Sequence, residues 1–387
     1  MRNDLKRIVH VAHDNFITYQ ATDEADLFYT EFGKLYLRTT QIIDDFDEKD
    51  LFGGIPYGEY LDIAEEFMAA AIMHRDCCMA LAEKTSHKSF LGNTLSYIFS
   101  KERYVSGLCE SRNLQPHKIF QIISCFTLNK TNCEEHLNYP GASLAPYIEL
   151  NDEVLLRSSH GCLDKPILFL NRELKRRFKT DYDKAKNNRE GRFRNQLYSL
   201  FTGKDIIKIK HNVVIKIENQ STDIDAILFD TENNVLGLFQ LKWQDTFSTS
   251  MTERFSRISN LIPKSVEWID KVFKWLEGNS QADVLKKLGI KKKTTVPLQI
   301  LTFVLSRNHM HFSNQTLDNR AIWGSWYQVI ESISKTKTDL STNSIRKLAQ
   351  NLRMFSPANR TELDDINIKD EQFKFSKYIV QIAQKPA

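Results

Sequence analysis

The sequence predicts a mixed α/β protein in which helices flank a sheet, preceded by an all-helical segment. Three observations support this fold class. Apolar residues recur at helical spacing through roughly the first 138 residues, with few turn residues among them. Residues 205–243 contain short runs rich in β-branched residues, separated by turns. Helical patterns stand before and after these runs, and a further strand pattern follows near residue 300, which is the order of a sheet with helices packed on it.

The first segment is expected to be a helical module, residues 1–150, whose role the sequence does not indicate. Its clearest helical patterns are Leu61–Lys84 and His117–Asn129. Two prolines and a glycine in "LNYPGASLAPYIELND" predict a domain boundary near residues 139–152. The chain beyond it is expected to form one domain over residues 151–310 and a C-terminal extension, 311–387, packed on that domain.

The second segment opens with two predicted helices. One runs from Pro166, which suits a first helical turn, to about Phe178. The other runs from about Asn187 to Phe201, and Gly203 follows as a stop signal.

Strands are predicted next. Residues 205–220 contain two strand patterns, and two more at 221–230 and 235–243 flank the turn "TENN", so residues 223–243 should form a hairpin. Two helices are expected after it, one opened by a capping box of Ser250 and Glu253 and one from Pro263 to Gly278. A core strand and a last helix complete the predicted elements, at 297–305 and within 338–355.

Composition limits the class of protein. Of the 387 residues, 41% are hydrophobic and 26% are charged, which is typical of globular domains with apolar cores. The apolar run Phe67–Met73 is far shorter than the roughly 20 residues that cross a bilayer, and the N-terminus has no apolar signal region. Six irregularly spaced cysteines without a CxxC pair are typical of reduced, buried thiols. We therefore expect a cytoplasmic protein with no membrane partner.

Charge is distributed unevenly along the chain. Residues 1–150 hold 14 Lys and Arg against 22 Asp and Glu, whereas residues 151–387 hold 39 against 27. The most basic stretch is 171–210. A basic half favours a polyanionic partner such as nucleic acid, although solvated helix faces would explain the same pattern.

Polar residues interrupt one face of the fourth predicted strand. Gln240 and Lys242 lie two apart in "GLFQLKWQD", so both point to one face of a strand whose neighbours are apolar. A buried amide or ammonium needs a partner or a ligand. If the hairpin forms, Asp225 of the third strand meets them at one end of the sheet. Two oxygen ligands, one of them a carboxylate, suit Mg²⁺, and an ammonium suits the attacking water and charged transition state of phosphodiester hydrolysis.

At these residues the chain resembles the PD-(D/E)XK nuclease superfamily, which has the restriction-endonuclease-like fold. The pattern reads "DIDAILFDTENNVLGLFQLK", in which Asp225 matches the strand aspartate and Gln240–Lys242 matches (Glu/Gln)-x-Lys. The resemblance covers roughly Pro166 to Leu305. It implies a mixed sheet flanked by helices and a nuclease that depends on Mg²⁺, with Mn²⁺ as a substitute. Asp225, Gln240 and the main-chain carbonyl of Leu241 would ligate the metal, and Lys242 would position the nucleophile.

The resemblance implies further site residues. Members of the superfamily often add a glutamate from the helix before the sheet, and Glu190 is the candidate, although it could equally balance the helix dipole. Gln244 continues the face of Gln240 and Lys242 outward. The arginines expected to contact phosphates lie on helices on either side of the strands, namely Arg192, Arg194, Arg254 and Arg257.

The function expected from these residues is metal-dependent hydrolysis of DNA, in restriction or another defence against foreign DNA. One alternative is a nuclease-like module that binds nucleic acid without cutting it. Another is that Asp225 and Lys242 form an ordinary cross-strand ion pair, which would contribute at most about 1 kcal/mol. A protein partner for the N-terminal segment and a homodimer both remain open.

Overall fold

The computed structural model describes residues 2–11, 17–85, 96–138, 144–244, 251–291, 296–307, 316–336, 340, 344–354, 372–375 and 378–381. Side chains are described for all of these except residues 2, 251–259, 335, 336 and those from 372 onward. The chain divides into two compact units. The first holds residues 1–192 and 245–259, and the second holds residues 193–244 and 260–387. The units therefore divide at residue 192, whereas the sequence predicted a boundary near residue 150.

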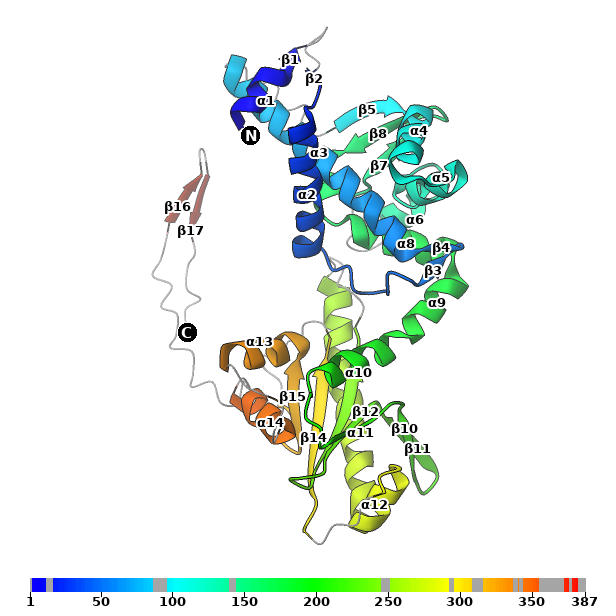
Figure 1. The fold of residues 1–387 in the computed structure, drawn as a ribbon, viewed down its shortest axis with the longest axis vertical. Coiled ribbons are helices and arrows are strands. Elements are labelled where there is room, and N and C mark those ends of the chain that lie inside the picture. Colours follow the sequence, from blue (N-terminus) through cyan, green and yellow to red (C-terminus); the bar gives the residue numbers. More distant parts are fainter. Residues whose placement is uncertain are drawn as a thin grey trace. The chain divides into compact units, whose positions relative to one another are not determined.

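The first unit combines helices with short strands (Figure 1). Its helices are α1 (Arg2–Ile8), α2 (Asp23–Thr40), α3 (Tyr57–Thr85), α4 (Lys101–Arg112), α5 (Pro116–Ser124), α6 (Cys133–Asn138), α7 (Ser159–Leu163), α8 (Pro166–Arg177) and α9 (Lys179–Asn187). Its strands are β1 (Val9–Val11), β2 (Ile17–Tyr19), β3 (Leu51–Phe52), β4 (Ile55–Pro56), β5 (Ser96–Ser100), β6 (Thr127–Leu128), β7 (Tyr147–Glu149) and β8 (Val154–Ser158). Helix α10 (Arg189–Ser199) begins in this unit and ends in the second.

The prediction of an all-helical N-terminal module is wrong. Residues 1–150 contribute three strands, β5, β6 and β7, to a four-stranded sheet with the order β5–β8–β7–β6. Two further hairpins, β1–β2 and β3–β4, also lie in this part of the chain. Strands of two to five residues are too short for the sequence to display their period. The partners of β5 and β6 lie far along the chain, in β8 and β7 respectively.

Helix α3 is the centre of the first unit. More than half of its residues are buried, which is why its apolar residues occupy so much of its circumference. Helix α2 crosses it closely at Gly33, where an added Cβ would lie 2.7 Å from the Cβ of Ala69. The main core of the unit also contains aromatic pairs such as Phe67 with Phe126, whose ring centres are 5.0 Å apart.

A buried carboxylate organises part of the basic run on α8. Glu173 has no exposed side-chain surface and accepts hydrogen bonds at 2.7 Å from Arg176 and from Arg177. Its other neighbour is His136 of α6, at 2.8 Å. Burial alone would raise the pKa of Glu173, but the hydrogen bonds from Arg176, His136 and Arg177 outweigh it and hold that pKa well below its ordinary value. Two arginines that the sequence assigned to a polyanion-binding stretch therefore bind within the protein.

The second unit is built on a five-stranded mixed sheet. Its strand order is β15–β14–β13–β12–β9, formed by β9 (Ile206–Ile209), β12 (Ala226–Asp230), β13 (Val235–Lys242), β14 (Gln299–Ser306) and β15 (Ala321–Ser325). Strand β12 is antiparallel to β9 and β13, whereas β13, β14 and β15 are parallel. The remaining elements are β10 (Val213–Ile217), β11 (Gln220–Ile224), α11 (Met251–Glu277), α12 (Gln281–Lys287), α13 (Trp326–Thr336), α14 (Ser344–Met354), β16 (Gln372–Phe375) and β17 (Tyr378–Gln381). Of α11, residues 251–259 belong to the first unit.

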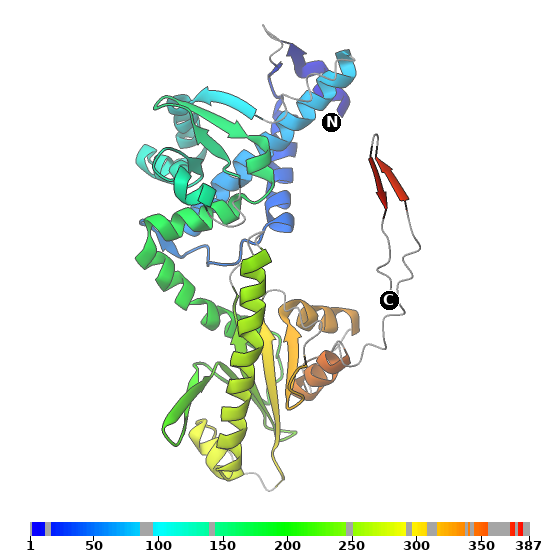
Figure 2. The ribbon, with the colours of Figure 1, turned by 180° about the vertical axis from the view of Figure 1, so that it is seen from behind.

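Helices cover both faces of this sheet (Figures 1 and 2). Helix α11 packs on one face, and we call the apolar residues there the α11-side core, which includes Ile227, Leu238, Ile269, Val272 and Val304. Helices α10, α13 and α14 pack on the other, and we call that cluster the α10-side core, which includes Phe193, Leu228, Phe239, Val329 and Leu348. The predicted mixed α/β class is confirmed for this part of the chain, and the C-terminal extension adds β15 to the sheet as well as packing α13 and α14 against it.

The predicted hairpin is present. Strands β12 and β13 pair from Asp230 opposite Val235 to Ala226 opposite Phe239. Asp230 stabilises the turn because its carboxylate accepts hydrogen bonds from the main-chain N–H groups of Glu232 and Asn233, at 3.1 and 2.9 Å. Asn234 completes the turn in the left-handed conformation, with φ of 51°.

The two helices predicted after the hairpin are one. Helix α11 continues through Pro263, which the sequence placed at the start of a new helix. Proline removes one helical hydrogen bond and costs about 3 kcal/mol in a helix interior. The apolar face outweighs this cost because it continues past the proline, from Leu261 and Ile262 to Trp268 and Trp275, all buried. Ser250, the predicted cap, lies outside the described residues.

Two predictions from composition can be compared with the described residues. Among the described residues, no helix is both long and apolar enough to cross a membrane. All six cysteines are free and four are buried. Burial raises the pKa of the Cys77, Cys125 and Cys162 thiols to about 12, so these thiols are protonated and unreactive at neutral pH.

Candidate functional site

Three of the predicted site residues lie together on one face of the second unit's sheet. Asp225 directly precedes β12, and its alternation with Ile227 places it on the α11 side. Gln240 and Lys242 alternate with Leu238 on β13 and therefore point to the same side. The antiparallel register brings Asp225 beside Gln240, because Ala226 pairs with Phe239. The hairpin thus brings Asp225 and Gln240 together as predicted, and Lys242 lies on the same face two residues further along β13.

The carboxylate of Asp225 is held by β13. Its Oδ2 accepts hydrogen bonds from Nε2 of Gln240 at 2.5 Å and from the main-chain N–H of Leu241 at 2.6 Å. The main-chain N–H of Asp225 donates to the carbonyl of Phe239 at 3.0 Å, which extends the β12–β13 ladder by one residue. Both side chains are buried, with 3% of Asp225 and 5% of Gln240 exposed. The acid is therefore fixed in place by the strand that carries the rest of the motif.

Helix α10 fixes the same strand end from the other side. Nη1 of Arg194 donates to the main-chain carbonyl of Asp225 at 3.0 Å. One turn further on, the hydroxyl of Tyr198 accepts from the main-chain N–H of Ile227 at 2.8 Å and donates to the carbonyl of Ile209 at 2.7 Å. Burial raises the pKa of Tyr198 to about 12, so the hydroxyl keeps its proton. Arg194, predicted to contact phosphate, has at least one of its N–H groups committed to holding Asp225.

Lys242 ends β13 and is half-buried. In the parallel register it lies opposite Ser306 of β14, which is fully buried. The carbonyl of Lys242 accepts a hydrogen bond at 2.9 Å from the main-chain N–H of Arg307. Sequence reasoning did not identify Ser306 or Arg307, because only the register of two strands separated by α11 places them beside the motif.

Arg307 lies over aromatic rings next to the motif. Its guanidinium carbon is 5.3 Å from the ring centre of Trp243, 5.4 Å from that of Trp326 and 5.9 Å from that of Phe193. These three rings belong to the α10-side core, so Arg307 packs on the face opposite Gln240 and Lys242. Cation–π contacts of this kind contribute about 0.5–2 kcal/mol and hold the end of β14 beside Lys242.

The other predicted site residues are not all in this group. Glu190 is exposed in the first turn of α10 and belongs to the first unit, as does Arg192. Arg192 donates to the main-chain carbonyl of Asp45 at 2.7 Å, a contact within the first unit. Gln244 is half-buried two residues beyond β13. The side chains of Arg254 and Arg257 lie outside the described part of the structure.

The oxygen atoms available at the motif suit a hard cation only in part. Asp225 supplies a carboxylate, and Gln240 and Leu241 supply an amide oxygen and a main-chain oxygen. In the described arrangement Nε2 of Gln240, not its oxygen, faces Asp225. Rotation of the amide would exchange the two atoms. Within the described residues, no group of three or more His, Cys, Asp or Glu side chains could hold a metal ion. A cation bound here would therefore keep several waters, as Mg²⁺ does.

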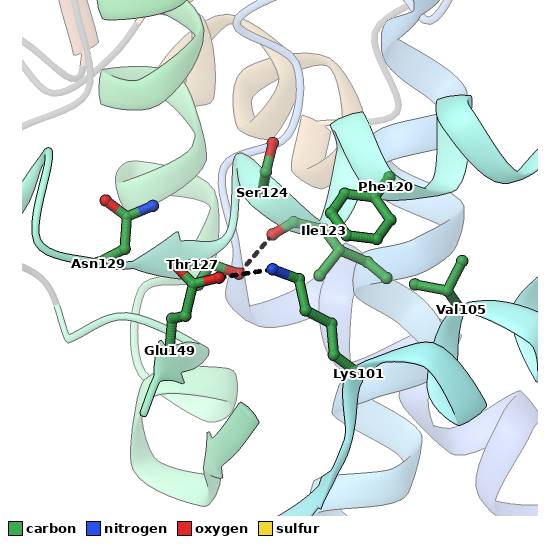
Figure 3. A pocket seen from close by; sticks show the side chains of 8 residues that line it. All are labelled: Lys101, Val105, Phe120, Ile123, Ser124, Thr127, Asn129 and Glu149. Carbon is green, nitrogen blue, oxygen red and sulfur yellow. Dashed lines mark hydrogen bonds and ion pairs between the residues drawn. The ribbon is translucent and has the colours of Figure 1, made fainter. Parts of the chain in front are cut away.

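A small pocket lies elsewhere, in the first unit (Figure 3). Lys101 reaches across it to Glu149, with 2.5 Å between Nζ and Oε1, and also lies 4.8 Å from the ring centre of Phe120. The hydroxyl of Thr127 donates to the carbonyl of Ile123 at 2.8 Å. The free space is about 20 Å³, enough for about one water molecule. The charged groups of this pocket bind each other, and it is too small to hold a nucleotide.

Comparisons of the chain with models of protein families, with curated proteins and with solved structures found no match.

Proposed function

We propose that the second unit is a metal-dependent phosphodiesterase that acts on DNA, with Asp225, Gln240 and Lys242 at its site. The observation that supports this most directly is the contact of the Asp225 carboxylate with Gln240 and the main chain of Leu241, at 2.5 and 2.6 Å, with Lys242 on the same face of the strand. An acid, an amide and an ammonium at one sheet end are the groups that the PD-(D/E)XK resemblance implies.

The surrounding elements also support the resemblance. A helix, α10, precedes the strands, and the acid and the Gln-x-Lys motif lie on the two strands of one hairpin. Helix α11 follows the hairpin, and the sheet is mixed, with helices on both faces. A chance match of so short a motif would not require this order of elements around it.

Each residue has a chemical role in the proposed reaction. Asp225, the amide oxygen of Gln240 and the carbonyl of Leu241 would hold Mg²⁺. The bound ion would supply Lewis-acid activation and offset the charge of the phosphate. Lys242 would orient the attacking water and stabilise negative charge that develops on the phosphate oxygens. Arg194 would keep Asp225 in position by its hydrogen bond to the main-chain carbonyl of Asp225.

The test is cleavage of plasmid and linear DNA by the full chain, with Mg²⁺, Mn²⁺ or EDTA. Asp225→Ala and Lys242→Ala should each lower the cleavage rate at least about 100-fold, because each removes a group that acts on the transition state or its metal. Lys216→Ala is the matched control, since Lys216 is an exposed lysine on β10 of the same unit. Gln240→Glu adds the missing negative charge and should lower the Mg²⁺ concentration needed for half-maximal rate. Cleavage by Lys242→Ala at the wild-type rate would rule out the assigned site.

One observation favours a second candidate, a nuclease-like module that binds DNA without cutting it. Nε2 of Gln240 donates to the same Asp225 oxygen that also accepts from Leu241, which satisfies that oxygen without a metal. This candidate predicts no cleavage with any metal and equal retention of DNA in Mg²⁺ and in EDTA. Metal-dependent cutting that is lost in Asp225→Ala would eliminate it.

A further inference from the structure

Arg157 is a buried cation on the four-stranded sheet of the first unit. It lies on β8, between Tyr97 of β5 and Tyr147 of β7 in the strand register. Only 8% of its surface is exposed. Its guanidinium carbon lies 5.3 Å from the ring centre of Tyr97 and 5.9 Å from that of Phe99. Aromatic rings thus hold the side chain in place, but they do not accept its strong hydrogen bonds.

No carboxylate compensates this charge among the described residues. The titratable groups that act most strongly on Arg157 there are the thiol of Cys162 and the phenols of Tyr147, Tyr104 and Tyr19. Burial raises the pKa of each of these groups, so all four are neutral at pH 7. Nε of Arg157 is buried and has no hydrogen-bond partner within the described part of the chain. Burying a charge without a counter-charge is costly, which makes an isolated arginine here unusual.

A second donor lies in the same neighbourhood. The hydroxyls of Tyr104 and Tyr147 are 2.7 Å apart and bind each other. Two hydroxyls carry two protons, and only one can lie between the two oxygens. The other proton has no acceptor among the described residues. The surroundings of Arg157 therefore offer a positive charge and hydroxyl donors, and no carboxylate acts on Arg157 among the described residues.

We propose that Arg157 is the anchor of a binding site for a small anionic ligand, which it holds through an oxyanion group, phosphate or carboxylate. The planar guanidinium presents donors that match two oxygens of such a group, and a hydroxyl of the Tyr104–Tyr147 pair adds another. Tyr97, 41% exposed beside the guanidinium, marks the side open to solvent. This site lies in the first unit and is independent of the nuclease chemistry proposed for the second.

The test is scanning calorimetry of the full chain in chloride, inorganic phosphate or citrate at equal ionic strength. All five tryptophans lie in the second unit, so tryptophan emission separates unfolding of that unit from unfolding of the first. A saturating oxyanion should raise the unfolding temperature of the first unit by about 5 °C or more. The larger shift shows whether phosphate or carboxylate is preferred.

Arg157→Met identifies the site. This variant should lose the oxyanion shift, and without ligand its first unit should be at least as stable as the wild type, because an uncompensated buried charge has been removed. Arg103→Met is the control, since Arg103 is an exposed arginine on α4 of the same unit. It should retain the full shift.

Three results would overturn the proposal. In the first, no oxyanion shifts the wild-type first unit. In the second, Arg157→Met retains the full shift, which would place the anion elsewhere. If Arg157→Met does not fold, Arg157→Lys replaces it and should weaken oxyanion affinity at least about tenfold, because lysine lacks the two-pronged donor geometry. The third result that would overturn the proposal is an Arg157→Lys variant that binds the oxyanion with the affinity of the wild type.

Discussion

Strand alternation places the side chains of the candidate site on one face of the sheet, whereas the arginines of the first unit are held by partners elsewhere in the chain. Asp225, Gln240 and Lys242 needed only a period of two and a short turn. The arginines were harder, because their partners are remote or hidden in composition. Arg176 and Arg177 lie three and four residues after Glu173, a spacing that predicts ion pairs on a helix, yet their positive charge suggested a polyanion-binding surface. His136, the third partner of Glu173, lies 37 residues earlier, and no local pattern indicates that contact.

Glu173→Gln should destabilise the first unit by about 3–5 kcal/mol at pH 7, because it leaves Arg176, Arg177 and His136 without the buried carboxylate that they share. Urea unfolding followed by near-ultraviolet circular dichroism of the tyrosines measures the change. Glu102→Gln, at an exposed position on α4, is the control and should change stability by less than about 0.5 kcal/mol.

The effect of Glu173→Gln should also depend on pH. The pKa of Glu173 is lower in the folded protein than its ordinary value of 4.5. The stabilisation by this group is therefore complete above pH 4.5 and is lost as the pH falls below that value. The difference in stability between wild type and variant should shrink between about pH 5 and pH 3. A difference that stays constant over this range would show that the charge of Glu173 does not provide the stabilisation.

Elements were predicted well where the pattern is long or bounded by clear turns. Helix α8, the β12–β13 hairpin and β14 fall close to the predicted ranges, because each has both a periodic pattern and a start or stop signal. The failures have two physical causes. Strands as short as β6 have no readable period, and tertiary packing carries α11 through Pro263 despite the unfavourable local signal.

Two helical glycines offer a matched test of packing between elements. A Cβ at Gly33 of α2 would lie 2.7 Å from both the carbonyl oxygen of Glu65 and the Cβ of Ala69 on α3, whereas a Cβ at Gly107 of α4 would meet nothing within 4 Å. Gly33→Ala should therefore force the two helices apart and cost about 1–3 kcal/mol. Gly107→Ala should be neutral or stabilise the unit by up to about 1 kcal/mol, because alanine favours a helix. The midpoints of urea unfolding of the two variants measure these effects. Equal midpoints for Gly33→Ala and Gly107→Ala would show that α2 and α3 do not approach so closely.

At the scale of the whole molecule, charge follows the units rather than the halves of the sequence. The first unit holds 27 Lys and Arg against 31 Asp and Glu, and the second holds 26 against 18, so their net charges are −4 and +8. The basic residues of 151–192 fold with the acidic N-terminal part and are partly neutralised there. Sequence position alone could not show this, because the assignment depends on which elements pack together.

The positive net charge of the second unit predicts how DNA affinity depends on salt. In EDTA the Asp225→Ala protein should bind duplex DNA with an affinity that falls steeply with salt, by about 0.9 logarithmic units per tenfold change in salt for each phosphate contact. Fluorescence anisotropy of a labelled duplex measures it. An uncharged oligonucleotide analogue of the same length is the control and should show no salt dependence. Absence of DNA binding at about 50 mM salt would instead favour a protein that only contacts other proteins.

The division of the chain at residues 192, 244 and 259 restricts how the protein can be taken apart. Neither unit is one uninterrupted stretch of sequence, so no single pair of cloning boundaries yields either of them whole. A fragment ending at residue 150 would separate His136 from Glu173 and β5 and β7 from β8, and it should be recovered as insoluble or proteolysed material. A fragment starting at residue 193 would carry 15 residues that belong to the first unit. Deletion mapping of the proposed sites would consequently report loss of folding, and point substitutions in the intact chain are the appropriate genetic tool.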